Sequence, residues 1–183
     1  MQAAAFKVAD GPVRSWADVP GWLGPSEGEA LADLARDRTV LEIGSFLGRS
    51  TAALASTARR VWAVDWHFKD RCTASVDVQD TLPGLRRNLT DCGLADKVII
   101  LCGLVDDVQE HLVGPFDLVF IDGAHDAKSV ARDAALARRV VAPGGVVAFH
   151  DVDEPGIAAG AETAGVWPLD VLENTRIGVW RSP

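Results

Sequence analysis

Apolar residues in this chain gather into five short runs separated by amphipathic stretches. The continuous apolar runs predict buried strands at residues 39–43, 61–65, 98–102, 116–121 and 146–150. Apolar positions at helical spacing predict helices at 26–36, 50–57, 81–91, 106–113 and 126–141. This alternation is typical of a parallel sheet covered by helices on both faces. We therefore expect a doubly wound α/β fold.

The alternation ends after residue 151. A short helix at 157–163 is followed by two strand-like segments, 166–169 and 176–181, with a turn-like stretch between them. These segments predict an antiparallel hairpin at one edge of the sheet. The whole pattern predicts one domain over residues 1–183, with a mostly parallel, seven-stranded, Rossmann-like sheet, a C-terminal hairpin and an N-terminal extension at 1–20. Trp167 and Trp180 make the hairpin a candidate homodimer surface.

Length and charge narrow the range of partners. The chain has 183 residues, which suits one folded domain, and a net charge of −8. Its basic residues are scattered, whereas binding to nucleic acid needs a concentrated positive face. No apolar run approaches the length of a membrane span, and no signal peptide is apparent. We expect a cytoplasmic protein that binds a small molecule, without nucleic-acid or membrane partners.

Ligands of open parallel sheets bind outside the carboxyl ends of the strands. The first of these ends carries Gly44 and Gly48 in the turn 42–50, where the backbone can approach a ligand closely. The turn lacks the GxGxxG pattern of a pyrophosphate site. Asp65 ends the second strand at the distance of about 20 residues where an acid meets a ribose diol. These features predict a nucleoside-like ligand that needs little phosphate recognition.

Five motifs carry a resemblance to a known family. They are Gly21-Trp22-Leu23, LEIGSFLGRST at 41–51, VDW at 64–66, FDLVFIDGAH at 116–125 and PGGVVAFHD at 143–151. Together they resemble the class I S-adenosylmethionine-dependent methyltransferases. More narrowly, they are similar to the small-molecule O-methyltransferases related to catechol, cephalosporin-hydroxylase-like and macrolide-sugar enzymes. The resemblance covers about residues 20–155 and implies an enzyme that methylates a small-molecule hydroxyl.

The resemblance also implies a cofactor site for S-adenosylmethionine. Gly44, Ser45 and Gly48 would line its methionine part, Asp65 would bind the ribose, Glu42 would lie beneath the turn, and Trp66 would stack near the adenine. The full set of cofactor-binding residues that we expect is Glu42, Gly44, Ser45, Phe46, Gly48, Ser50, Asp65, Trp66, Gly103, Leu104 and Asp122.

One position departs from the family pattern. Relatives usually carry a small or polar residue after the glycine that follows the third strand, and this chain has Leu104 there. Adenine recognition is therefore expected from backbone groups or from a neighbour such as Asp106.

Two devices for handling the acceptor proton fit the residues. Metal-dependent relatives use acids after the fourth and fifth strands, which implies a divalent-cation site at Asp122, Asp151 and His150. Magnesium is the first choice, and a histidine ligand would favour manganese, iron or zinc. Alternatively, His125 acts as the general base. The expected catalytic residues are thus His125, Asp122 and His150, whereas His67 and His111 carry no comparable argument.

Two other functions compete with this interpretation. A nicotinamide-dependent oxidoreductase can share the same architecture, although the third glycine of the dinucleotide motif is missing. A non-catalytic protein that only binds S-adenosylmethionine is the second alternative.

Overall fold

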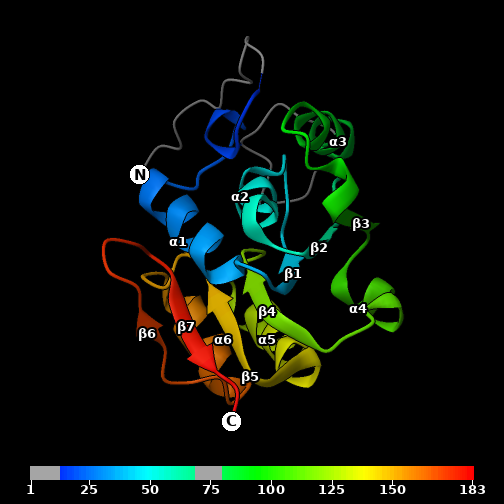
Figure 1. The fold of residues 1–183 in the computed structure, drawn as a ribbon. Coiled ribbons are helices and arrows are strands. Elements are labelled where there is room, and N and C mark those ends of the chain that lie inside the picture. The colour runs from blue at the N-terminus through cyan, green and yellow to red at the C-terminus, as the bar shows by residue number, and fades with distance from the viewer. Residues whose placement is uncertain (1–12, 69–79) are drawn as a thin grey trace.

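The computed structural model describes residues 13–68 and 80–183. It contains a seven-stranded sheet in the order β3-β2-β1-β4-β5-β7-β6 (Figure 1). The strands are β1 (Thr39–Ile43), β2 (Arg60–Asp65), β3 (Val98–Cys102), β4 (Phe116–Ile121), β5 (Val141–Phe149), β6 (Asp170–Val171) and β7 (Gly178–Arg181). β1 to β5 pair in parallel, and β7 is antiparallel to both β5 and β6. The expected doubly wound sheet with a C-terminal antiparallel pair is confirmed.

Six α-helices cover the two faces of the sheet in the described part of the chain. They are α1 (Pro25–Ala35), α2 (Arg49–Thr57), α3 (Leu82–Asp91), α4 (Val105–Val108), α5 (Ala127–Val140) and α6 (Pro155–Thr163). Short 3₁₀ turns lie at Trp16–Asp18, Ala95–Lys97 and Gln109–His111. The first three helices lie on one side of the sheet and the last three on the other (Figure 1).

Alternating side chains along β4 show how the strands join both layers. Leu118 and Phe120 pack in the core that includes α1 and α2, whereas Val119 and Ile121 pack in the core that includes α5 and α6. All four side chains are buried. A strand buried on both faces is apolar at most of its positions, which explains why the strand could be predicted from the sequence.

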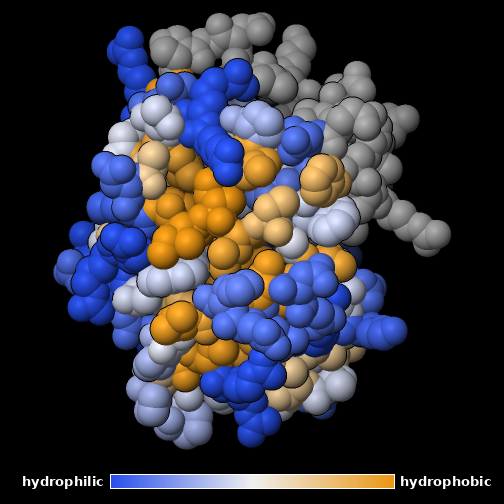
Figure 2. All heavy atoms as spheres, turned by 90° about the vertical axis from the view of Figure 1, so that its right-hand side faces the viewer, coloured by the Kyte–Doolittle hydropathy of each residue, from blue (hydrophilic) through white to orange (hydrophobic). Residues whose placement is uncertain are grey.

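The two ends of the sheet differ from each other. β3 forms one edge, and its apolar residues are only partly buried. Apolar side chains gather on the side of the molecule that carries α3, β3 and α4 (Figure 2). At the other edge, β6 begins at Asp170, so the strand expected at 166–169 is misplaced. Pro168 cannot donate a backbone hydrogen bond to a strand ladder, and the pairing begins only after it.

The register of the strands sets the position of the site. Ile43 of β1 pairs with Val64 of β2 and with Ile121 of β4, and Ile121 pairs with Phe149 of β5. The residues that follow these positions must therefore lie side by side at one edge. The order reverses between β1 and β4, which is where open α/β sheets bind ligands.

None of the described helices is both long and apolar enough to cross a membrane. Of the expected extension at 1–20, residues 1–12 lie outside the described part. Residues Trp16–Asp18 pack against α2, and Arg49 of α2 donates hydrogen bonds to the carbonyls of Ala17, Val19 and Leu23.

Candidate active site

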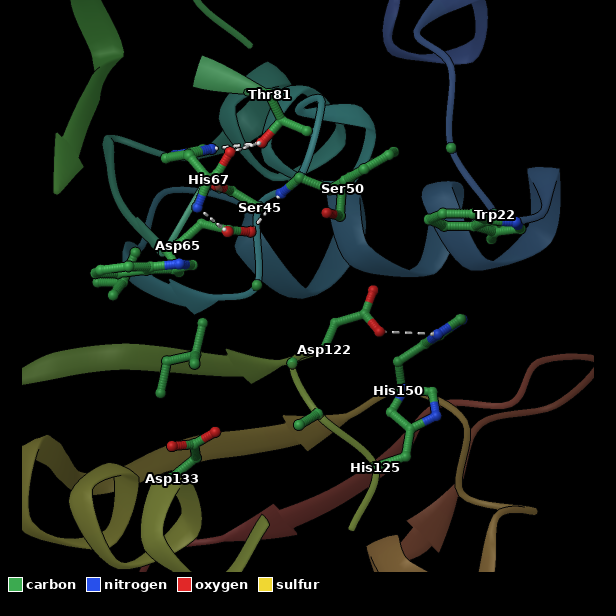
Figure 3. A pocket seen from close by; sticks show the side chains of 18 of the residues that line it. Trp22, Ser45, Ser50, Asp65, His67, Thr81, Asp122, His125, Asp133 and His150 are labelled. Atoms are coloured by element: carbon green, nitrogen blue, oxygen red, sulfur yellow. Dashed lines mark hydrogen bonds and ion pairs between the residues drawn. The ribbon is translucent and has the colours of Figure 1, made fainter. Parts of the chain in front are cut away.

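A cavity of about 600 Å³ opens at the carboxyl ends of the parallel strands. This volume is within the usual range for small-molecule sites. Most of the residues expected from the sequence line it together, and several are labelled in Figure 3. These are Gly44, Ser45, Phe46, Ser50, Asp65, Trp66, Gly103, Leu104, Asp122, His125, His150 and Asp151. Glu42 and Gly48 are outside the lining and support it from behind.

The first turn has a backbone conformation that favours glycine. Gly44 and Gly48 have φ angles of +96° and +91°. A Cβ atom on Gly44 would lie 2.2 Å from the carbonyl oxygen of Asp122, so the turn after β1 and the end of β4 touch backbone to backbone. Gly48 precedes the first residue of α2. The turn therefore leaves no room for a side chain at Gly44, and its backbone conformation disfavours one at Gly48.

Glu42 lies fully buried beneath this turn. Its Oε2 accepts a hydrogen bond of 2.5 Å from the Thr51 hydroxyl, whereas Oε1 has no partner among the described residues. Burial is the main cause that raises the pKa of Glu42 to about 8. The hydroxyls of Ser50 and Thr51 oppose this rise, and the nearby carboxyl groups of Asp122 and Asp65 add to it. A cation placed beside Oε1 would favour the ionised form.

The raised pKa of Glu42 predicts a pH-dependent stability. Between pH 4.5 and about 8 the folded state holds a proton that the unfolded state has lost. Glu42 therefore lowers the free energy of unfolding as the pH rises, by up to about 1.4 kcal/mol per pH unit, and the effect levels off above pH 8. Urea denaturation from pH 5 to 9 should show a shallower decline for Glu42→Gln than for the wild type. Exposed Glu29→Gln is the control, and parallel curves for wild type and Glu42→Gln would contradict the assignment.

Asp65 fastens the first turn to the end of β2. Its Oδ2 accepts a hydrogen bond from the Phe46 amide at 2.7 Å, and its Oδ1 accepts one from the His67 amide at 2.8 Å. Each carboxylate oxygen can accept a second hydrogen bond, so the group can still serve a ligand. The ribose role expected for Asp65 stays a prediction.

Beyond Asp65 the cavity walls become apolar. Trp66 and Leu104 are large apolar residues that remain 41% and 47% exposed while lining the cavity. Trp66 also packs edge-on against Phe68, with ring centroids 5.2 Å apart. Apolar side chains of this kind on the cavity wall suit a flat ring.

His67 lies in the same region, although the sequence offered no argument for it. Its Nδ1 lies 2.9 Å from the Thr81 hydroxyl, and its buried Nε2 has no partner among the described residues. Burial lowers the pKa of His67, which favours the neutral imidazole.

Two acids and two histidines meet at the ends of β4 and β5. Ligand atoms of Asp122, His125 and Asp151 all lie within 4.8 Å of one another. His125 Nε2 lies 3.3 Å from Asp151 Oδ2. His150 Nδ1 lies 3.3 Å from both Asp122 Oδ1 and Asp151 Oδ2. The expected residues are thus brought together, and their chemical roles stay predictions.

Glu27 of α1 completes this cluster and was missed in the sequence. Its Oε2 lies 3.2 Å from His150 Nε2, so both ring nitrogens of His150 face carboxylates. Burial lowers the pKa of His150, but the bonds to Asp122 and Asp151 outweigh it and raise the pKa to about 11. These contacts favour the imidazolium form of His150 at neutral pH. The catalytic and metal roles expected for His150 require the loss of that proton, and they stay predictions.

Arg176 closes the acidic side of the cluster. Its guanidinium contacts Asp151, and its backbone amide donates to Glu27 Oε1 at 3.1 Å. Arg176 lies just before β7 and lines the cavity, so the C-terminal part of the chain contributes to the cavity wall. Asp133 of α5 also lines the cavity and was missed as well.

Comparison with known proteins agrees with this geometry. Residues 41–152, more than half of the chain, match the family described as methyltransferase domain. A catechol O-methyltransferase of Mycobacterium tuberculosis (strain ATCC 25618 / H37Rv) is 34% identical over 143 residues, which are 70% of this chain and 60% of that protein. The chain thus spans about 60% of the length of this curated relative.

Solved structures show the same fold. Cofactor-bound Rv0187 from MTB is 27% identical, with a TM-score of 0.65 over 89% of this chain and 82% of that chain. An O-methyltransferase from Bacillus cereus in complex with SAH is 21% identical, with a TM-score of 0.65 over 91% and 86%. The sheet order, the strand-end cavity and the matched residues lead to one assignment: this chain belongs to the methyltransferase domain family.

Proposed function

We propose that the chain is an S-adenosylmethionine-dependent O-methyltransferase acting on a small-molecule hydroxyl. The observation that carries this proposal is a pair of buried polar atoms at the turn after β1. Glu42 Oε1 and Ser45 Oγ are buried there without partners among the described residues. They lie next to the backbone of Gly44, which has no side chain to block a ligand. Buried polar atoms without partners are costly, so they fit a ligand that supplies an ammonium and a carboxylate.

The charge of the turn disfavours the nicotinamide alternative. The carboxyl groups of Asp65 and Asp122 lie close enough to Glu42 to help raise its pKa. The guanidinium of nearby Arg49 is held by three backbone carbonyls of the N-terminal segment. A pyrophosphate would bring further negative charge to these acidic groups, whereas a sulfonium cation would favour the ionised form of Glu42 and be attracted to it.

Methyl transfer to a hydroxyl requires alignment of donor and acceptor and removal of the acceptor proton. The acceptor would lie next to Asp122, His125 and Asp151, at the end of the cavity opposite Trp66 and Leu104. His125 is 41% exposed, so its imidazole can take up the proton and pass it to solvent. The imidazolium of His150 holds the two aspartates in place.

The same three residues fit a divalent cation. Two carboxylates and one imidazole within 4.8 Å of one another offer oxygen and nitrogen ligands, which suit magnesium and, with the histidine, manganese. When bound, the cation would lower the pKa of the acceptor hydroxyl. We place His125 in this set instead of the expected His150 because its ligand atom lies with those of Asp122 and Asp151, whereas the nitrogens of His150 face Glu27 and Asp122.

Ligand-induced stabilisation tests the proposed cofactor. S-adenosylhomocysteine at about 100 times its Kd should stabilise the folded state by about 2.7 kcal/mol and raise Tm by about 5–10 °C. NAD at the same concentration should leave Tm unchanged. A shift with NAD alone would favour the oxidoreductase, and a shift with S-adenosylhomocysteine without turnover on catechols or sugars would favour the non-catalytic alternative.

Metal removal tests the cation. We expect EDTA to lower turnover at least tenfold and Mg²⁺ or Mn²⁺ to restore it, while S-adenosylhomocysteine binding stays the same. Full turnover in EDTA would leave His125 as the general base without a metal.

A further inference from the structure

The adenine end of the cavity lacks a polar residue after β3. Leu104 and Val105 line the cavity there, and Asp106 is exposed and outside the lining. Besides His67, whose pKa is lowered by burial, the cavity lining includes the polar side chains of Arg132 and Asp133 on α5. An exocyclic amine buried in an apolar slot without an acceptor would cost binding energy.

Asp133 is the buried member of this pair, with 2% of its surface exposed. Arg132 Nε donates a hydrogen bond of 3.0 Å to Asp133 Oδ1. The other oxygen, Oδ2, lies 3.5 Å from the position that a Cβ on Gly123 would take. Gly123 has no side chain and itself lines the cavity, so a ligand can approach Oδ2 there. Asp133 is drawn below the ends of the strands in Figure 3.

We propose that Asp133 is a specificity-determining residue that accepts the exocyclic amine of adenine. This inference rests on the proposed function and names the group that selects a 6-aminopurine. Burial raises the pKa of Asp133, and the Arg132 guanidinium bonded to Oδ1 opposes this rise. In its ionised form the carboxylate only accepts hydrogen bonds, so it pairs with the amine but repels the oxygen of a 6-oxopurine. The position also explains how the chain can carry Leu104 after β3, because the acceptor is supplied by the helix after β4.

Calorimetry with two nucleosides tests this role. We expect wild-type protein to bind S-adenosylhomocysteine at least about 100-fold more tightly than S-inosylhomocysteine. The 6-oxo group of the inosine compound would place a second hydrogen-bond acceptor against the Asp133 carboxylate. In Asp133→Asn the carboxamide can both donate and accept, so the preference should fall below about tenfold, mainly through tighter binding of the inosine compound. A purely structural role would weaken both ligands equally and keep the ratio.

Exposed Asp91→Asn, outside the cavity lining, is the matched control and should keep the wild-type ratio. Asp106→Asn tests the neighbour expected from the sequence and should keep this ratio too. A wild-type ratio near one overturns the proposal without any variant, even if Asp133→Asn does not fold. An unchanged ratio in Asp133→Asn, or a collapse in Asp106→Asn instead, also overturns it. Wild-type protein that binds neither nucleoside overturns the proposed function as well, which separates the two failures.

Discussion

The Asp122→Asn enzyme is expected to turn over about 100 to 10,000 times more slowly than the wild type. Asp122 lies between the glycine turn and His150, with Oδ1 3.3 Å from His150 Nδ1, and it lines the cavity where donor and acceptor must meet. The amide keeps the shape of the side chain but removes the charge that orients the acceptor hydroxyl and any cation. The affinity for S-adenosylhomocysteine should change less than about tenfold, because the turn and Asp65 are untouched.

Steady-state kinetics measure the expected fall in kcat, and calorimetry on the same preparations measures the Kd for S-adenosylhomocysteine, which should change little. Asp153→Asn is the matched control, since Asp153 is an exposed acid outside the cavity and only two residues beyond Asp151. It should retain wild-type values for both constants. A kcat within threefold of wild type in Asp122→Asn would exclude Asp122 from the chemical step.

Much of the sheet was predictable because its strands are buried on both faces. The run at Phe116–Ile121 contains a single charged residue, Asp117, and the expected strand matches β4. The strand expected at 146–150 is observed as β5, which begins earlier, at Val141, and so includes the residues 143–145 that precede the apolar run. Strand pairing there depends on β4 and on a register shift between Phe116 and Leu118, which local composition does not encode.

The site was predictable where it follows a strand and less so where it lies on a helix. Asp65, Asp122 and His150 each sit at a strand end, so the register of a parallel sheet brings them to one edge. Glu27 and Asp133 were missed, although a pattern could have revealed them. Each replaces an apolar residue on the buried stripe of its helix: Glu27 lies four residues before Leu31, and Asp133 lies three residues after Val130.

Arg176 could not have been found in this way. It precedes a four-residue strand in an antiparallel edge pair, and its contact with Asp151 depends on how β7 docks on β5. Long-range docking of this kind leaves no periodic trace in a single sequence. The same holds for the pairing of His150 with Glu27, which joins α1 to the end of β5.

Gly44→Ala should both destabilise the fold and abolish cofactor binding. The added Cβ would lie 2.2 Å from the Asp122 carbonyl oxygen, and the φ of +96° is unfavourable for alanine. Strain and steric overlap together predict a loss of about 2–6 kcal/mol in the free energy of unfolding. Relief of the overlap requires the turn to move away from the end of β4, which would open the contact between the two strand ends where we propose that the cofactor binds. Urea denaturation measures the first effect and calorimetry with S-adenosylhomocysteine the second.

The control for Gly44→Ala is Gly93→Ala. Gly93 has a comparable positive φ of +69°, but an added Cβ there would meet nothing within 4 Å. It should lose only the conformational cost of about 1–2 kcal/mol and bind S-adenosylhomocysteine normally. The difference between the two variants therefore isolates the close approach of β1 and β4. Equal stability losses, or normal cofactor binding by folded Gly44→Ala, would show that the backbone contact at Gly44 does not shape the cofactor site.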